Sequence, residues 1–126
     1  MSRFVYDAGV LVAADRGDRR VWLAHTARLM ERSVPLVPAP VVAQVSRSSR
    51  QAQLRRFLAG CHIAPLEERD AHVAGHLLGK SRTADVVDAS VVAIALRYQA
   101  VIITGDVKDM ERLAAVADAG VGVVGL

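Results

Sequence analysis

The chain has 126 residues, 52% of them hydrophobic, and a formal net charge of +3 at pH 7. A chain of this length buries about two-thirds of its surface on folding, and its one cysteine, Cys61, cannot form an internal disulfide, so a disulfide-stapled scaffold is excluded. No apolar run approaches the ~18 residues of a membrane span, and Arg3 and Asp7 interrupt any signal-peptide pattern. We therefore expect a single domain over residues 1–126, located in the cytoplasm and not attached to a membrane.

The first predicted elements are a short strand and two helices. Residues 3–7 form an apolar strand with Asp7 at its carboxyl end, and a helical pattern follows over residues 8–14. After a turn, a second helix is predicted over residues 19–31. One face of this helix is predicted to carry Leu23, Ala27 and Met30, with Trp22, Thr26 and Leu29 beside them.

Prolines divide the middle of the chain into short elements. Pro35, Pro38 and Pro40 exclude a helix over residues 34–37, where a short strand is predicted instead. Pro40 is well placed to begin the next helix, which carries Gln44.

Two more helices and a strand follow. Residues 50–59 are predicted as a helix, residues 62–64 as a strand and residues 67–79 as a second helix. The helix predicted over residues 67–79 carries His72 and His76 at the four-residue spacing of zinc ligands. Since no HExxH glutamate and no nearby cysteine pair completes a zinc site, we interpret both histidines as surface or packing residues.

Four aspartates lie at element boundaries in the last third of the chain. Asp85 and Asp88 are three residues apart and share one face of the first turn of a helix. The β-branched run at residues 101–103 predicts a buried parallel strand, and Asp106 follows its carboxyl end. Asp109 lies three residues further on, in the first turn of the next helix.

A helix over residues 107–116 and an edge strand over residues 121–124 complete the chain. Strands alternate with helices throughout, which predicts the α/β class, with a sheet rich in parallel pairs and right-handed crossovers.

Three of the aspartates are predicted to meet at one edge of this sheet. If the strands that precede Asp7 and Asp106 are parallel neighbours, both residues lie at the carboxyl edge, where α/β proteins bind ligands, and the nearby helix delivers Asp88. Two carboxylates about 4 Å apart repel by about 4 kcal/mol at an effective dielectric near 20, so three of them require protonation or a cation. Hard cations take oxygen ligands. The pattern therefore predicts a Mg²⁺ or Mn²⁺ pocket suited to phosphodiester chemistry.

Each aspartate also has a simpler interpretation as a helix cap. Aspartate is among the preferred N-cap residues and is favoured in a first helical turn, with a stabilisation of about 1 kcal/mol or less. Asp85 and Asp106 can be caps and nothing more. The combination of Asp7, Asp88 and Asp106 is harder to explain in this way, because the three come from separate elements.

The middle of the chain carries basic side chains without any acidic ones. Residues 32–65 contain five arginines and no acid, whereas residues 85–118 contain six acids. Guanidinium groups bind phosphate oxygens with two parallel hydrogen bonds, and a basic stripe beside an acidic metal pocket suits a polyanionic substrate. We interpret the stripe as a nucleic-acid-binding surface, with a solvated helix face as the alternative.

Four segments of the chain match a known family in their order and spacing. They are Val5-Tyr6-Asp7-Ala8-Gly9, Pro40-Val41-Val42-Ala43-Gln44-Val45, Asp88-Ala89-Ser90-Val91-Val92-Ala93, and Ile103-Thr104-Gly105-Asp106 with Asp109 behind it. With these segments the chain resembles PIN-domain proteins, specifically the VapC-type ribonuclease toxins of bacterial toxin–antitoxin pairs. The resemblance covers essentially the whole length. It implies a PIN-like three-layer α/β/α fold with a short, mostly parallel central sheet.

The resemblance also implies roles for individual residues. The implied metal-site carboxylates are Asp7, Asp88 and Asp106, with Asp109 beside them. Thr104 would be a supporting hydroxyl and Asp85 an auxiliary acid. The implied activity is Mg²⁺- or Mn²⁺-dependent hydrolysis of RNA.

One position departs from the family pattern. Gln44 stands where the family usually has a glutamate, and no acidic residue occurs between Glu31 and Glu67 to replace it. A glutamine can coordinate through its amide oxygen or position a water, but it brings no negative charge and cannot act as a base. Two functional hypotheses follow: an active endoribonuclease, or a weakened or inactive PIN domain that acts through RNA or antitoxin binding.

The resemblance further implies partners. These are an RNA substrate such as transfer RNA, a cognate antitoxin that blocks the site, and a second copy of the chain in a homodimer. The candidates for contacts with RNA or antitoxin are Arg47, Arg50, Arg55 and Arg56. A phosphoacceptor receiver module has a similar length but fits poorly, because its acid pair after the first strand and its lysine after the last strand are missing.

Overall fold

The computed structural model describes residues 3–126. Its centre is a five-stranded sheet in the order β3-β2-β1-β4-β5, in which every described pairing is parallel. In chain order the described elements are β1 (Phe4–Tyr6), α1 (Ala8–Asp15), α2 (Arg19–Met30), β2 (Leu36–Pro38), α3 (Ala39–Val45), α4 (Ala52–Ala59), β3 (His62–Ala64), α5 (Glu68–Ser81), α6 (Val86–Tyr98), β4 (Val101–Thr104), α7 (Val107–Ala114) and β5 (Val123–Gly125). The predicted α/β class is confirmed.

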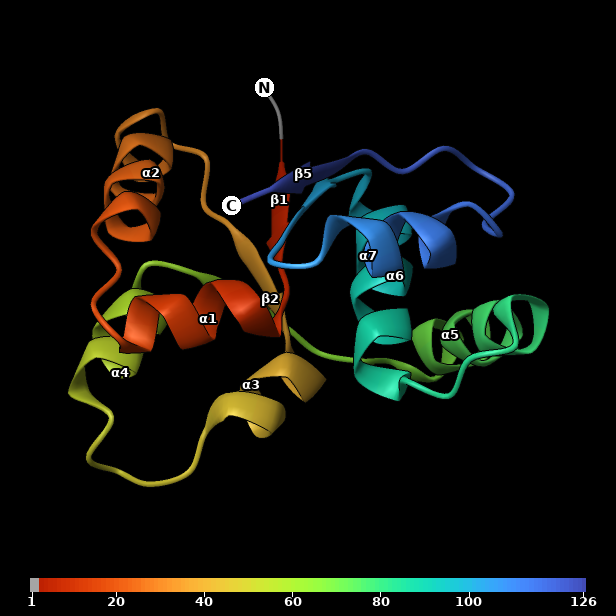
Figure 1. Cartoon of the computed structure of the whole chain (residues 1–126), viewed down its shortest axis with the longest axis horizontal. Coiled ribbons are helices and arrows are strands. Elements are labelled where there is room, and N and C mark those ends of the chain that lie inside the picture. The colour runs from red at the N-terminus through yellow and green to blue at the C-terminus, as the bar shows by residue number, and fades with distance from the viewer. Residues whose placement is uncertain (1–2) are drawn as a thin grey trace.

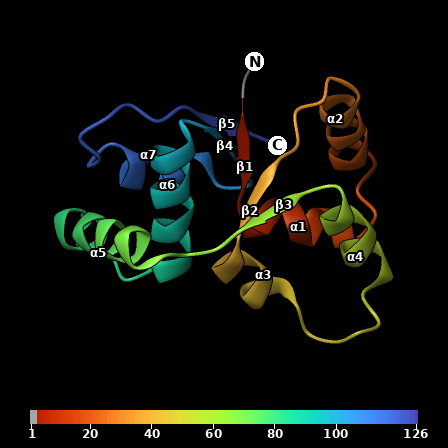
Figure 2. The ribbon, with the colours of Figure 1, turned by 180° about the vertical axis from the view of Figure 1, so that it is seen from behind.

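Helices cover both faces of the sheet, as parallel strands with right-handed crossovers require. α1, α2 and α4 lie on one side of the sheet, and α5, α6 and α7 lie on the other (Figure 1 and, from behind, Figure 2). The central strand β1 contacts α1 on one face and α6 on the other. This is the three-layer α/β/α arrangement predicted from the sequence.

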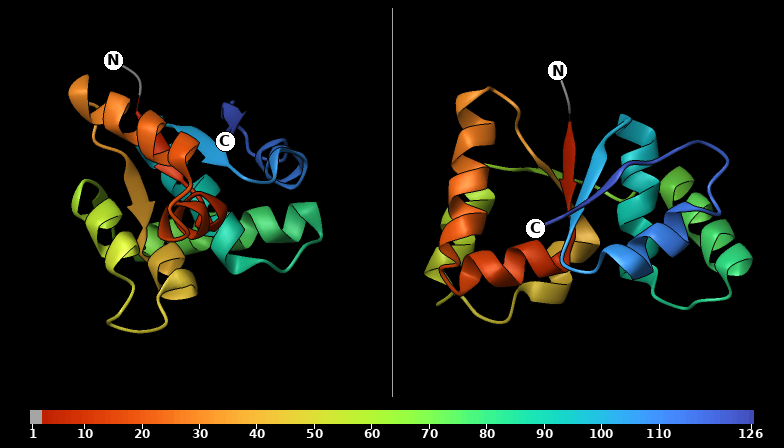
Figure 3. Two further views of the ribbon diagram at one scale, coloured as in Figure 1. Left: turned by 60° about the vertical axis from the view of Figure 1, so that its left-hand side comes forward. Right: turned by 45° about the horizontal axis from the view of Figure 1, so that its top comes forward.

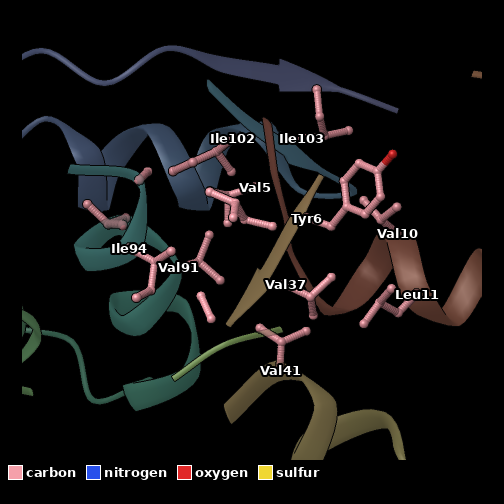
Figure 4. Packing of buried hydrophobic residues seen from close by; sticks show 14 of the residues in the cluster. Val5, Tyr6, Val10, Leu11, Val37, Val41, Val91, Ile94, Ile102 and Ile103 are labelled. Atoms are coloured by element: carbon pink, nitrogen blue, oxygen red, sulfur yellow. The ribbon is translucent and has the colours of Figure 1, made fainter. Parts of the chain in front are cut away.

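Neighbouring residues of the two central strands point to opposite faces of the sheet. Val5 and Ile102 face Ile94 of α6, whereas Tyr6 and Ile103 face α1 (Figure 4). All five are buried, and each contributes roughly 1.5–3 kcal/mol through the hydrophobic effect. Because both faces are covered in this way, the ends of the strands are the places where the sheet is open.

The carboxyl ends of the strands lie together at one edge of the sheet. α1 begins directly after β1, α3 after β2 and α7 after β4, and the start of α6 lies at the same edge (Figures 1 and 3). α3 packs against both α1 and α6. Every element predicted to carry a metal-site residue therefore begins or ends at this edge, which we call the carboxyl edge.

The face of α2 that carries Leu23, Ala27 and Met30 is not the buried face of the helix. Leu23 and Met30 are 60% and 81% exposed, whereas Val21 and His25 are buried. The imidazole of His25 enters the core because the hydroxyl of Tyr6 bonds to its Nδ1 at 2.9 Å, and a buried polar group needs such a partner. The spacing of apolar residues does not reveal a buried polar pair whose members lie on different elements.

The remaining boundaries differ from the predictions by a few residues. β2 begins at Leu36 rather than at residue 34, and α5 continues to Ser81. His72 and His76 are exposed on α5, as expected for surface histidines. None of the helices within residues 3–126 is long and apolar enough to cross a membrane.

Candidate active site at the carboxyl edge

Asp7 is held in place by the end of β1 and the start of α1. Its backbone N–H donates to the Ile103 carbonyl at 3.2 Å, so the β1–β4 pairing extends past the last residue of the strand. Its Oδ1 accepts a hydrogen bond from the Val10 N–H at 3.3 Å and thereby caps α1. The N–H groups of Gly9 and Gly105 also donate to this carboxylate. With 6% of the residue exposed, the side chain has one well-defined position.

Thr104 connects Asp7 to Asp106. The hydroxyl of Thr104 donates a short hydrogen bond to Asp7 Oδ2, and the Thr104 Oγ1 accepts a hydrogen bond from the Asp106 N–H at 2.9 Å. Thr104 itself is fully buried. Since a hydroxyl has one proton to donate, this arrangement uses that proton on the Asp7 carboxylate and fixes the backbone that presents Asp106.

The helix-cap interpretation of Asp85 and Asp106 is confirmed. Asp106 Oδ1 accepts the Asp109 N–H at 3.1 Å at the start of α7, and Asp85 Oδ1 accepts the Asp88 N–H at 3.0 Å at the start of α6. A cap uses one oxygen of each carboxylate and leaves the other available for a cation or a water. Capping and metal binding are therefore compatible at these positions.

The carboxylates at this edge repel one another. The pKa of Asp88 is raised from 3.8 to about 6, first by burial and then by the nearby carboxylates of Asp85, Asp7 and Asp109. Burial also raises the pKa of Asp7, while the hydrogen bond from Thr104 opposes this effect. The structure thus brings four of the predicted acids close enough to influence one another, namely Asp7, Asp85, Asp88 and Asp109.

This set of donors fits a hard divalent cation that is bound partly through water. Within residues 3–126, no three His, Cys, Asp or Glu side chains are clustered tightly enough to hold a metal ion by themselves. Mg²⁺ typically uses one or two protein carboxylates and keeps several waters, and the buried Asp7 and half-buried Asp88 supply two carboxylates. A cation between them also relieves the repulsion that raises the pKa of Asp88.

Gln44 is near this edge but is not joined to it. It is exposed on α3, the helix that packs against α1 and α6 at the ends of the strands (Figure 1). Among the hydrogen bonds of the described residues, none joins the Gln44 amide to an aspartate. The structure therefore places Gln44 on a helix that begins at the carboxyl edge, and gives its side chain no fixed role there.

The four arginines predicted to contact RNA or antitoxin are exposed, namely Arg47, Arg50, Arg55 and Arg56. Within residues 3–126, no carboxylate lies within 4 Å of their guanidinium groups. Gln51 orders the loop that precedes α4, because its Oε1 accepts the Arg47 N–H at 2.7 Å and its Nε2 donates to Asp15 Oδ2 at 3.1 Å. The loop and α4 thus form an ordered basic surface, defined here by these four arginines.

Three contributors to the site were missed by sequence reasoning. Gly9 and Gly105 donate backbone N–H groups to Asp7, and a Cβ on Gly9 would lie 3.4 Å from both Asp7 Oδ1 and the Gly105 backbone. A glycine close to each strand-end aspartate was an available signal. Gln51 gave no signal, because its role depends on Asp15, which lies 36 residues away in the sequence.

Comparisons with known proteins were made by sequence and by structure. No protein-family model and no curated protein matches the sequence. The structure is similar to a chain of VapBC2 from Rickettsia felis bound to a DNA fragment from their promoter, with 16% identity, 98% of each chain covered and a TM-score of 0.76. For DNA-bound VapBC from Salmonella typhimurium the values are 12% identity, 99% of this chain and 98% of that chain covered, and a TM-score of 0.75. For a toxin–antitoxin complex from Klebsiella pneumoniae they are 19% identity, 95% and 94% covered, and 0.70.

At these identities the likeness establishes the fold, and it does so over nearly the full length of the chain. It confirms the PIN-like arrangement that the sequence resemblance implied.

Proposed function

We propose that this chain is a VapC-type PIN-domain toxin that hydrolyses RNA phosphodiester bonds at the carboxyl edge, using Mg²⁺ or Mn²⁺. The observation that carries the proposal is the hydroxyl of Thr104, which joins the carboxylate of Asp7 to the backbone of Asp106. Burial disfavours the ionised form of the Asp7 carboxylate, and its four hydrogen-bond donors oppose this effect. A bound cation would stabilise the same ionised form.

The proposed metal-site carboxylates are Asp7, Asp88, Asp106 and Asp109, which would bind the cation partly through coordinated water. Thr104 orients Asp7 and favours its ionised form, while Asp85 orients the first turn of α6, which presents Asp88. When bound, the divalent cation would polarise the scissile phosphate and lower the pKa of a coordinated water.

The arginines of the basic surface and Gln44 would act on the bound RNA. The exposed guanidinium groups of the basic surface bind the RNA backbone and bring it to the carboxyl edge, or they bind acidic side chains of an antitoxin. Gln44, on the exposed side of α3, positions a water or coordinates weakly through its amide oxygen. Transfer RNA is the substrate class that the family resemblance favours, and the site of action would be the cytoplasm.

A protein partner also belongs to this proposal. The similar structures include toxin–antitoxin complexes, and the apolar side chains of Leu23 and Met30 are exposed on α2. Exposed apolar side chains on one helix favour a protein contact when they are covered on binding. We expect a cognate antitoxin that masks the carboxyl edge, and a homodimer of the free toxin.

Cleavage of RNA tests the proposal. The purified chain is incubated with total transfer RNA, with and without Mg²⁺ or Mn²⁺, beside its Asp7→Asn variant. The matched control is Asp118→Asn, since the Asp118 side chain is 97% exposed and is bound to Lys80 rather than to a site residue. We expect metal-dependent cuts at discrete positions that fall about 100-fold or more in Asp7→Asn and persist in the control. Equal cleavage by both variants would contradict the proposed site.

A second candidate function is an inactive PIN domain that binds RNA or antitoxin without turnover. Gln44 favours this alternative, because the position lacks the charge and the basicity of the usual glutamate. Tight binding of transfer RNA without cleavage, at any concentration of Mg²⁺ or Mn²⁺, would identify this function in the same assay.

A further inference from the structure

A hollow of about 540 Å³ lies at the edge of the sheet opposite the carboxyl edge, where β1, β2 and β3 begin. It is lined by Arg3, Arg32, Ser33, Val34, Leu36, His62 and Tyr98. We call it the amino-edge hollow. In Figure 1 this edge lies where the arrow of β1 begins, away from the start of α1. Its volume falls within the roughly 300–1,000 Å³ of small-molecule sites.

The lining of the hollow is basic. It contains two arginines and a histidine but no acid, and within residues 3–126 no carboxylate lies within 4 Å of the guanidinium of Arg3 or Arg32. Arg97, which lies next to the hollow, is different. Its guanidinium is bound to Glu67 at 3.1 Å and to Asp70 at 3.0 Å, so its charge is already compensated. The uncompensated positive charge at this edge therefore lies on Arg3 and Arg32.

Arg32 occupies its place in an unusual backbone conformation. Its φ is +60°, and it directly follows the C-cap of α2, where the Ser33 N–H closes the helix on the Arg28 carbonyl at 2.9 Å. Glycine is the residue usually found at such a left-handed position, because a side chain there costs about 1 kcal/mol. The arginine is thus not the choice that the turn itself favours.

Apart from Ser33, the rest of the lining is apolar and aromatic. Leu36 is buried, Val34 is 52% exposed, and the ring of Tyr98 lies under the Arg3 guanidinium at 6.0 Å. A ligand that matches this lining has a flat or apolar body and one strongly anionic group. Phosphate oxygens fit the planar fork of a guanidinium with charge-assisted hydrogen bonds.

We propose that the amino-edge hollow binds the phosphomonoester of a nucleotide, with Arg3 and Arg32 on the phosphate and the base against Val34 and Leu36. A free nucleotide and the 5′-phosphate end of an RNA present the same chemistry. The site goes beyond the proposed cleavage function and stands whether or not the carboxyl edge is active, because it uses none of the same residues.

The arginines that follow helix ends allow a matched test. Arg32→Gly removes the guanidinium from the hollow and relaxes the backbone. Arg82→Gly makes the same change at the C-cap of α5, where φ is +58° and the side chain lines no part of the hollow. Both variants lose one charge and gain the residue that the turn favours. Neither should unfold the chain, and thermal melting checks this directly.

The measurement is an NMR titration of the three proteins with AMP, adenosine and a 5′-phosphorylated or 5′-hydroxyl oligonucleotide, in EDTA to prevent cleavage. We expect AMP, but not adenosine, to shift the amides of residues 32–36 and Tyr98, with affinity reduced about tenfold in Arg32→Gly and unchanged in Arg82→Gly. Selective binding of the phosphorylated oligonucleotide over AMP would support the same site with an RNA end as its ligand. Absence of binding by every phosphorylated probe, or equal losses in the two variants, would overturn the proposal.

Discussion

The side-chain hydroxyl of Thr104 donates a hydrogen bond to the carboxylate of Asp7, 97 residues away in the sequence. The parallel pairing of β1 with β4 places them side by side, since Tyr6 is in register with Ile103. The buried hydroxyl of Thr104 therefore helps to position two predicted metal ligands. It orients the carboxylate of Asp7 directly, and it holds the backbone of Asp106 through the Asp106 N–H.

Replacing Thr104 with valine keeps the shape of the side chain but removes both hydrogen bonds. We expect Thr104→Val to lower the free energy of unfolding by about 2 kcal/mol at neutral pH, because a buried carboxylate loses a donor. The lost bond favours the ionised form of Asp7, so the pKa of Asp7 rises further. The loss is therefore larger at pH 8, where Asp7 is ionised, than at a pH low enough to protonate it. Urea unfolding at both pH values measures this. Thr26→Val, at an exposed position on α2, is the control, and an equal loss in both variants would contradict the account.

Asp88 makes stability depend on pH in the opposite sense to an ordinary ion-paired carboxylate. Its pKa in the folded chain is about 6 against 3.8 for the free group, so the folded state holds more protons between these values and stability falls as pH rises through them. In EDTA, Asp88→Asn should be more stable than the parent by about 1 kcal/mol at pH 7.5, a value reduced for the partial exposure of the side chain. The difference should vanish below about pH 4. Thermal melts across this range test the prediction, and a destabilised variant at pH 7.5 would refute it.

Adding a carboxylate to α3 tests the departure from the family pattern. Gln44→Glu should strengthen Mg²⁺ binding and raise RNA cleavage by about tenfold or more, because it adds a negative charge beside the cation. Gln99→Glu is the control, since Gln99 is also exposed but follows α6 at the other edge of the sheet. Calorimetric titration with Mg²⁺ and the cleavage assay provide the two readouts. If Gln44→Glu changes neither the Mg²⁺ affinity nor the rate of RNA cleavage, α3 has no part in the site.

The basic surface should bind the phosphate backbone without regard to RNA sequence. Arg50→Ala is expected to weaken transfer RNA binding and to reduce the slope of log affinity against log salt by about 1. Arg69→Ala removes one exposed arginine from α5, on the other side of the sheet, and serves as the control. Filter binding at several salt concentrations measures both slopes. The same change of slope in both variants would mean that net charge, and not this surface, governs binding.

The sequence was sufficient to predict the architecture of the chain. Alternating short β-branched runs and helical patterns indicate a parallel α/β sheet, since each such strand must be covered on both faces. The strand-end aspartates could be placed at one edge because parallel strands all finish there, and the β1–β4 register confirms that Asp7 and Thr104 are neighbours.

What the sequence could not predict depends on contacts between distant residues. The burial of His25 requires Tyr6, so the apolar pattern of α2 did not reveal it. The role of Gln51 requires Asp15. The raised pKa of Asp88 arises from burial and from Asp7, Asp85 and Asp109 acting together. Each of these features depends on residues that are distant in the sequence and become neighbours only when the chain folds.

The central claim is that the carboxyl edge binds a divalent cation, and Mn²⁺ binding measured by electron paramagnetic resonance tests it most directly. The parent chain and Asp118→Asn should lower the signal of free Mn²⁺ when they are added. Asp7→Asn and Asp88→Asn should leave most of this signal unchanged. Bound Mn²⁺ should also be released as pH falls below about 6, because Asp88 takes up a proton there. Equal Mn²⁺ binding by the parent chain and by both edge variants would contradict the account.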